Sequence, residues 1–536
     1  MSTPTLPSLS RRSFLRGTLG ATVAATSAGL LAGCAGGDGA KDSAVKRLRF
    51  GVNNPKVTLD TQKTSSDVGV SEAVAEALIN LDPETQELFP VLLKELPSVS
   101  DDGLTYSFEL KEGVKFHNGE TLKASDVKFT LTRMFLPATK ATSTDSYVYI
   151  EGAKEVMNGS STELAGVEVQ DDTHFTIRLT QPYSTFTAML AQFYAVIYPE
   201  RACSEAGESW GSGTNFIGTG PFKISSNDDS TECVLVAFED YHGGRPGLDE
   251  VDFVYIDDAN TRMMNYKNGD IDLAFIDRDL MGQYKEDPEV KDQIVYYTPG
   301  SCQFVNLNQK NEYLADVRVR EALSLAINRE EICSTILAGC AKPASCFLPE
   351  SCTGHDSSLE VLEYNPERAR ALLAEAGAEG ITLNAQVRSQ DQKIMVALQD
   401  SWAKIGVTCN VTVIDNGVWA DSRKNGDLVV TTVTWSTLSF QGIEHMGSYF
   451  RSDRAAQKSS FYASDAFDAL VDEARQTVND NDRVIDLTKQ ADRQLVRSDW
   501  ACLPIDWPQM PYALKPEFSG LKVLVNPLFG GVSVKA

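Results

Sequence analysis

Short strand patterns and short helix patterns alternate along almost the whole chain, and no internal repeat interrupts them. Residues 47–53, 251–256 and 408–414 have strand patterns, whereas residues 259–268 and 392–405 have the spacing of helices. A chain of 536 residues is too long for one ordinary hydrophobic core, and its length favours about two to four domains. The sequence therefore predicts an α/β protein with several lobes.

The same patterns predict further elements. A helix is expected over residues 67–80, another begins at the cap Ser125 and ends near residue 135, and residues 167–179 form a hairpin. Asn365 and Pro366 are typical of an N-cap and a first helical residue. A strand over residues 429–435 and helices over residues 464–479 and 482–497 complete the second half of the chain.

The N-terminus has the features of an export signal. Arg11 and Arg12 resemble a twin-arginine motif, although a plain Sec signal is the alternative. The uncharged residues 18–31 that follow are too few for a bilayer-spanning helix, which needs about 20. Residues 31–34 match the lipobox of bacterial lipoproteins. We therefore expect removal of residues 1–33, a lipid on Cys34 that anchors the protein outside the cytoplasm, and a tether over residues 34–45.

Charge and cysteine content exclude some classes of function. The formal net charge of −25 opposes binding to nucleic acid, which requires a basic surface. Cysteines 333, 340, 346 and 352, with His355, are too irregularly spaced for a zinc ribbon, so no metal and no other cofactor is expected. A local disulfide within this group is expected in an exported protein, with buried free thiols as the alternative.

Several segments occur in the order found in one protein family. They are residues 102–119 (DGLTYSFELKEGVKFHNG), 124–129, 218–222, 241–246, 256–275 and 316–329. Together they resemble family 5 extracytoplasmic solute-binding proteins, which serve dipeptide, oligopeptide and nickel ABC importers. Most of these segments have a structural explanation in turns and helix starts, so we do not assign them to a site.

The resemblance implies a two-lobed, type II periplasmic-binding-protein-like fold with an extra domain on the first lobe. Two chain crossings near residues 298–307 and 502–510 are expected to act as hinges. The expected segments are 46–90 (first lobe), 91–205 (extra domain), 206–300 (first lobe), 301–505 (second lobe) and 506–536 (first lobe). The implied partners are a small or peptide ligand and the permease and ATPase subunits of an importer, with the protein itself a monomer.

The resemblance also points to a ligand site in the second lobe. We expect a small or medium solute, peptide-like or another polar organic molecule, to stack on Trp419 and Trp435, with Arg423 near an anionic group. Tyr147 and Tyr149 join these residues by looser analogy. Peptide-binding members have an Asp three residues after this Trp, where this chain has Leu438. Leucine cannot neutralise an amine. We therefore do not expect an ordinary peptide to bind in the way usual for this family, unless Glu444 or Asp67 supplies the negative charge.

Three alternatives stay open. Residues 207–211 match the G-x-S-x-G pattern of hydrolases, but the strand and helix that should flank the nucleophile are missing from the pattern, so no enzyme is expected. A sensory lipoprotein without a transporter is the second alternative. The third is nickel-chelate binding, for which His445 lies near the site but at a different spacing from the family's histidine.

Overall fold

Two mixed β-sheets carry most of the strands in the computed structural model, which describes residues 45–64, 69–228 and 230–535. Val45–Ala536 forms one unit. The predicted export signal, Cys34 with most of its tether, and Asp67 lie outside the described residues. Among the described residues, no helix is long and apolar enough to cross a membrane.

The first sheet gathers strands from distant parts of the chain. Their order is β12 (Ile294–Tyr297), β19 (Met510–Leu514), β11 (Leu273–Phe275), β1 (Arg47–Val52), β10 (Glu250–Tyr255), β9 (Glu232–Ala237) and β8 (Phe222–Asp228). β1 runs parallel to both β10 and β11. Phe50, Phe253 and Phe529 contact one another in its core, so this sheet has a hydrophobic core of its own.

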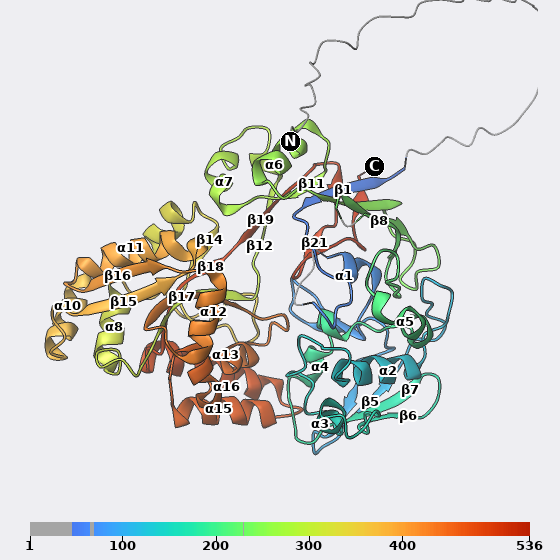
Figure 1. Ribbon diagram of the computed structural model, residues 1–536, viewed down its shortest axis with the longest axis horizontal. Coiled ribbons are helices and arrows are strands. Elements are labelled where there is room, and N and C mark those ends of the chain that lie inside the picture. Colours follow the sequence, from blue (N-terminus) through green and yellow to red (C-terminus); the bar gives the residue numbers. More distant parts are fainter. Residues whose placement is uncertain (1–44, 65–68, 229, 536) are drawn as a thin grey trace, which may run out of the picture. The chain divides into compact units, whose positions relative to one another are not determined.

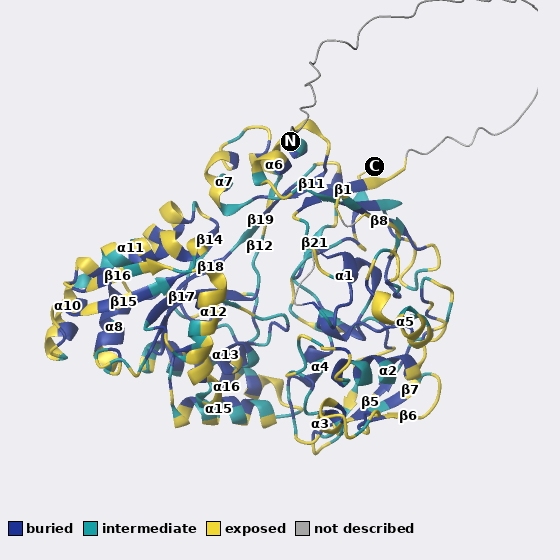
Figure 2. Cartoon of the chain, in the orientation of Figure 1, coloured by how far each residue is buried: buried dark blue, intermediate teal, exposed yellow. Residues whose placement is uncertain are grey.

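The second sheet lies between two layers of helices. Its order is β14 (Ala341–Pro343), β18 (Cys502–Pro508), β13 (Ser301–Leu307), β17 (Val430–Ser436), β15 (Thr382–Val387) and β16 (Thr408–Val413). Helices α8 (Val317–Leu325), α10 (Pro366–Glu375) and α11 (Gln392–Ala403) share one core with it. Helices α12 (Asn416–Asn425), α13 (Gly442–Phe450), α15 (Asp465–Gln476) and α16 (Asn481–Arg493) share the other. Figure 2 shows β17 and β18 largely buried between them.

A third, antiparallel sheet lies inside the segment expected to be an extra domain. It consists of β4 (Ser98–Val99), β5 (Thr105–Glu109), β7 (His174–Arg178) and β6 (Val167–Val169). Helix α2 (Ala124–Phe135) packs with it in a separate core, and Figure 1 shows α2, β5, β6 and β7 as one group. The β6–β7 hairpin confirms the one predicted from the sequence.

The chain passes twice between the first and second sheets. Residues 298–300 join β12 to β13, and Gln509 joins β18 to β19. β18 pairs with β13 and β14 as far as Pro508, which keeps residues 506–508 in the second sheet although the sequence placed the end of that lobe at residue 505. Asp506 therefore belongs to the second sheet.

The remaining elements are shorter. They are α1 (Val70–Val74), α3 (Ala153–Met157), α4 (Phe186–Met189), α5 (Glu200–Ala206), α6 (Ala259–Asn268), α7 (Arg278–Tyr284), α9 (Arg329–Glu331), α14 (Ser452–Ala455), β2 (Ile79–Leu81), β3 (Leu88–Pro90), β20 (Phe518–Ser519), β21 (Lys522–Val523), β22 (Pro527–Leu528) and β23 (Ser533–Val534). The predicted helix over residues 67–80 is wrong beyond Val74, because Ala75 turns to extended backbone. The N-cap is Lys123 and not the predicted Ser125, and the Lys123 backbone amide donates to Asp126 Oδ2 at 2.9 Å.

The expected local disulfide is absent. The nine cysteines that the structure describes are all free and buried. Cys333 and Cys340 lie in two separate hydrophobic clusters, whereas Cys346 and Cys352 lie together in a third. Within the described residues there is also no cluster of His, Cys, Asp and Glu that could hold a metal ion.

Candidate functional site

Three aromatic side chains form a platform at one end of the second sheet. Trp435 is the penultimate residue of β17 and donates its Nε1 hydrogen to Ser448 Oγ at 3.2 Å. Trp419 of α12 donates to Thr431 Oγ1 at 2.8 Å, and Tyr449 of α13 packs edge-on against Trp435. Parallel strands β15 and β17 end on this side, where ligands bind in open α/β sheets. We call Trp419, Trp435 and Tyr449 the aromatic platform.

Three cations lie over the aromatic platform. Lys458 Nζ is 4.3 Å from the centre of the Trp435 ring. The Arg423 guanidinium is 4.8 Å from the Trp419 ring and 5.9 Å from that of Trp435. Arg388 lies 4.5 Å from the Trp419 ring. Ring faces attract cations, so the platform fixes these side chains in place.

The cations on the platform carry more positive charge than their surroundings neutralise. Burial lowers the pKa of Lys458 to about 8, helped by repulsion from Arg423 and Arg454 and opposed only by Asp145. Over the described residues, neither Lys458 nor Arg423 forms an ion pair, and Arg423 Nε is buried without a hydrogen-bond partner. Arg388, in contrast, donates to Asp391 at 2.7 Å. A site of this kind attracts an anion.

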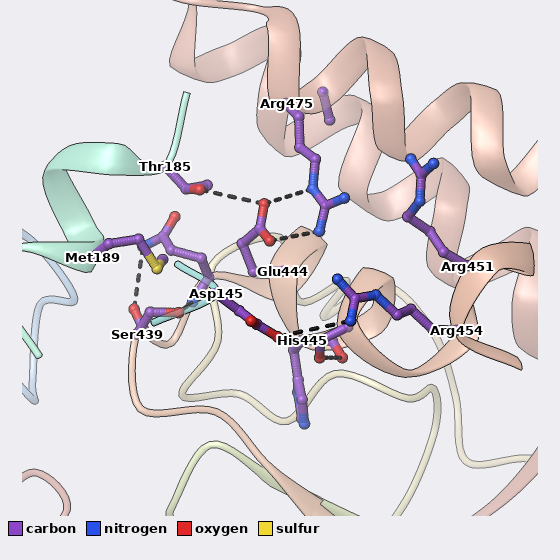
Figure 3. Close-up of polar contacts among 12 residues, drawn as sticks. Asp145, Thr185, Met189, Ser439, Glu444, His445, Arg451, Arg454 and Arg475 are labelled. Carbon is purple, nitrogen blue, oxygen red and sulfur yellow. Dashed lines mark hydrogen bonds and ion pairs between the residues drawn. The ribbon is translucent and has the colours of Figure 1, made fainter. Parts of the chain in front are cut away.

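One acid reaches the cations from another part of the chain. Asp145, from the region of the third sheet, lies 3.7 Å from Arg454 beside the second sheet, as Figure 3 shows. Asp145 is largely exposed and Arg454 is about half exposed, so the pair contributes little stability by itself. The ion pair nevertheless brings the region of the third sheet into contact with the cations beside the aromatic platform.

Glu444, which the sequence offered as a substitute for the missing Asp, already has a partner. Glu444 is half of a buried, bidentate ion pair with Arg475 and also accepts from Thr185, as Figure 3 shows. Leu438, three residues after Trp435, packs against the core of the third sheet and so forms an apolar contact there. Glu444 therefore does not substitute for the missing Asp in this conformation.

The structure brings only some of the predicted ligand residues together. Trp419, Trp435 and Arg423 meet on one surface, but Trp419 is only 5% exposed. Tyr147 is fully buried in the core of the third sheet, where its hydroxyl donates to the Met189 carbonyl. Tyr149 packs against the same core and contacts Tyr183. Neither tyrosine joins the aromatic platform.

Two further candidates have structural partners. His445 is buried and shares a 2.9 Å hydrogen bond with the Trp435 carbonyl, and burial lowers its pKa to about 4. It therefore positions Trp435 as a neutral side chain. Ser209, in the hydrolase-like pattern, lies in an exposed 3-10 turn and donates to the Ala206 carbonyl.

Sequence reasoning missed Lys458, Arg388 and Tyr449. Lys458 ends the 3-10 turn Ala456–Lys458, and Arg388 follows β15. These residues come from separate loops and helices, and only the order of strands in the sheet brings them together. No local pattern marks them.

A family model decides the relationship. The description "Bacterial extracellular solute-binding proteins, family 5 Middle" matches residues 87–457, more than half of the chain. This protein belongs to that family. The fold is therefore the type II periplasmic-binding-protein fold of this cluster, and members of the family are extracytoplasmic.

Curated relatives cover most of the chain. The dipeptide-binding protein of Escherichia coli K12 is 27% identical over 475 residues, which are 84% of this chain and 86% of the relative. Heme-binding protein A of Haemophilus influenzae is 28% identical over 445 residues, 78% of this chain and 79% of its own. A glutathione-binding protein of Escherichia coli is 27% identical over 451 residues, 81% of this chain and 84% of its own.

Solved structures agree on the fold. HbpA2 from Haemophilus parasuis has a TM-score of 0.81 at 23% identity and covers 91% of this chain and 100% of its own. DppA from Helicobacter pylori, in complex with the peptide STSA, has a TM-score of 0.72 at 23% identity and covers 91% of this chain and 98% of its own.

Proposed function

We propose that this family 5 solute-binding protein captures a solute that carries a carboxylate or another anionic group, and delivers it to an ABC importer. The observation that carries the proposal is the pair Lys458 and Arg423, two cations held over the aromatic platform without an acidic partner among the described residues. Bringing an anion there would relieve their mutual repulsion and neutralise partly buried charge.

The relatives support the same chemistry. A dipeptide, glutathione and heme differ in size and shape, yet each carries at least one carboxylate. An anion subsite is the feature that a binding protein for any of them could use. The solute is accordingly peptide-like or another polar organic acid of small or medium size.

The aromatic platform has a different role from the stacking surface expected from the sequence. Two guanidiniums already lie over Trp419 and an ammonium lies over Trp435, so the rings contact the protein's own cations in this conformation. In this proposal the rings orient the cations, and the cations bind the solute. Tyr147 and Tyr149 support the wall of the third sheet behind Leu438.

The remaining parts of the proposal concern location and partners. Cys34 carries the lipid, which keeps the monomeric protein on the outer face of the membrane, and the protein turns over no substrate. Replacing Cys34 by Ala should abolish labelling with palmitate and release the protein from the membrane. Genes for permease and ATPase subunits beside this gene would favour import, whereas their absence would favour a sensory role.

A thermal-shift screen tests the function directly. Free di- and tripeptides, their C-terminal amides, metal chelates and sugars would be compared at equal concentration. A solute at a hundredfold excess over its dissociation constant stabilises the fold by about 2.7 kcal/mol, which is easily detected. Shifts should be confined to compounds with a free anionic group. Shifts produced equally well by the amides or by neutral sugars would contradict the proposal.

A further inference from the structure

The cations beside the aromatic platform differ in whether an acid of the protein accompanies them. Three of them have an acidic partner: the pairs are Arg388 with Asp391, Arg451 with Asp472, and Arg454 with Asp145. Over residues 45–64, 69–228 and 230–535, Lys458 and Arg423 form no such pair. Of these five cations, the two without an acidic partner in the described structure are those that lie over the Trp435 ring.

The same two side chains also have unused hydrogen-bond donors. Arg423 Nε is buried and has no partner among the described residues. The Lys458 ammonium lies 4.3 Å from the centre of the Trp435 ring and 5.5 Å from that of Tyr449, and it donates to no acceptor in the described part of the chain. A ring face attracts a cation but brings no negative charge of its own. Both groups can therefore still donate to oxygen atoms of a bound solute.

The two cations are close enough to act on one group. Arg423 lies 5.9 Å from the centre of the Trp435 ring, the same ring that Lys458 covers. Burial, together with repulsion from Arg423 and Arg454, lowers the pKa of Lys458 to about 8. Charges more than about 10 Å apart are largely screened, so this repulsion also indicates that the two cations are neighbours. A single group beside Trp435 can therefore interact with both.

Balancing this charge requires two negative charges. Asp145 raises the pKa of Lys458, but its side chain is 84% exposed and already lies beside Arg454. A solute group with one negative charge would neutralise one cation and leave the other in a partly buried place. A group with two negative charges would compensate both cations and remove their mutual repulsion. It would also offer three or more oxygen atoms to the donors of Lys458 and Arg423.

We propose that the anionic group of the captured solute carries two negative charges, as a phosphoryl or phosphonate group or two neighbouring carboxylates do, and that Lys458 and Arg423 recognise both charges together. The inference rests on the proposed function, which requires an anionic group but no second charge. It narrows the solute to a doubly charged organic acid. A solute with a single carboxylate at this position should bind more weakly.

The test compares probes that are matched in shape and differ by one charge. Methyl phosphate and methyl sulfate have nearly the same shape. Above about pH 7 the phosphate carries two negative charges and the sulfate ester carries one, because the second pKa of a phosphate monoester is about 6. Malonate and its monomethyl ester are the equivalent pair of carboxylates. Binding is followed at constant ionic strength by the nuclear magnetic resonance signal of the Trp435 indole N–H, which is identified by its loss in Trp435→Phe.

The wild type should prefer the doubly charged probes. We expect a saturable shift of the Trp435 signal, with at least one doubly charged probe binding about tenfold more tightly than its singly charged partner. A preference within the phosphate pair assigns the charges to a phosphoryl or phosphonate group, and a preference within the malonate pair alone assigns them to two carboxylates. At about pH 5 methyl phosphate has a single charge, so any advantage over methyl sulfate should disappear. Sulfate keeps two charges over this range and reports any titration of the protein itself.

Variants connect the preference to the two cations. Lys458→Met leaves only Arg423 and should lose most of the preference for the doubly charged probe, whereas Lys458→Arg keeps the charge and should retain the preference. Lys424→Met removes an exposed lysine next to Arg423 in α12 and is the matched control, with no change expected. A full preference in Lys458→Met would contradict recognition by both cations.

The inference and the proposed function can fail separately. Equal binding of the two members within both pairs of probes would leave an anion site intact and overturn the requirement for a second charge. If no probe shifts the Trp435 signal more than sodium chloride does, the anion site itself is contradicted, and the proposed function with it.

Discussion

At the scale of single residues, Lys458 is kept in a position that costs stability. Its ammonium is partly buried, repelled by Arg423 and Arg454, and supported only by ring faces and the distant Asp145. Lys458→Met should therefore raise the stability of the empty protein at pH 7 by on the order of 1 kcal/mol, since one pKa unit corresponds to about 1.4 kcal/mol and the ammonium keeps part of its hydration. Chemical denaturation measures the change. Lys424→Met, an exposed lysine of the same region, is the control and should change nothing.

Asp506 should produce a specific pH dependence. The carboxyl has an ordinary pKa of 3.8 when unfolded and a pKa of about 7 when folded, because it is buried. Between these pH values the folded protein holds a proton that the unfolded chain has released. The contribution of Asp506 to the free energy of unfolding therefore falls as the pH rises from about 4 to about 7. Denaturation at pH 5 and pH 8 should show a smaller loss of stability in Asp506→Asn than in the wild type. Equal losses would mean that Asp506 titrates normally.

At the scale of elements, helices α13 and α15 beside the second sheet contact the loop that precedes α4. Glu444 of α13 pairs with Arg475 of α15 and accepts from Thr185, while the Ser184 amide donates to the Arg475 carbonyl. Glu444→Gln leaves a buried guanidinium without a carboxylate and should lower the free energy of unfolding by about 3 kcal/mol. Glu473→Gln breaks the exposed pair with Arg483 and should cost less than about 1 kcal/mol. Equal losses of stability in the two variants would show that the buried Glu444–Arg475 pair contributes no more than an exposed one.

The same scale shows what the sequence could predict. Elements with strong local signals are confirmed, such as α6 at residues 259–268 and α10 with its Asn365 cap. The predicted helix over residues 67–80 ends early because Gly218 and Gly220 approach the backbone of Val74, so residues after it are buried by tertiary contacts rather than by one helical face. Trp435 and Arg423 could be placed through the family resemblance. Lys458 and Asp506 could not, because pairing between distant strands determines their surroundings.

At the scale of the whole molecule, two contacts join the region of the third sheet to the helices beside the second sheet: Asp145 with Arg454, and Thr185 with Glu444. Solute binding should stabilise these contacts. A solute bound at Lys458 and Arg423 would favour the conformation in which these contacts form. Small-angle X-ray scattering should show a smaller radius of gyration with a bound solute than without it. Glu444→Gln should reduce this difference, and a radius of gyration unaffected by saturating solute would contradict closure.

The central claim is that an anionic group of the solute binds at Lys458 and Arg423. Isothermal titration calorimetry tests it most directly, with the tightest-binding solute from the thermal-shift screen and its uncharged amide or ester. Wild type and Lys424→Met should bind the anionic form with the same affinity. Lys458→Met should bind it at least tenfold more weakly and should prefer it less strongly over the uncharged form, because only Arg423 is left to bind the anion. Unchanged affinity in Lys458→Met, or equal binding of both forms by the wild type, would contradict the account.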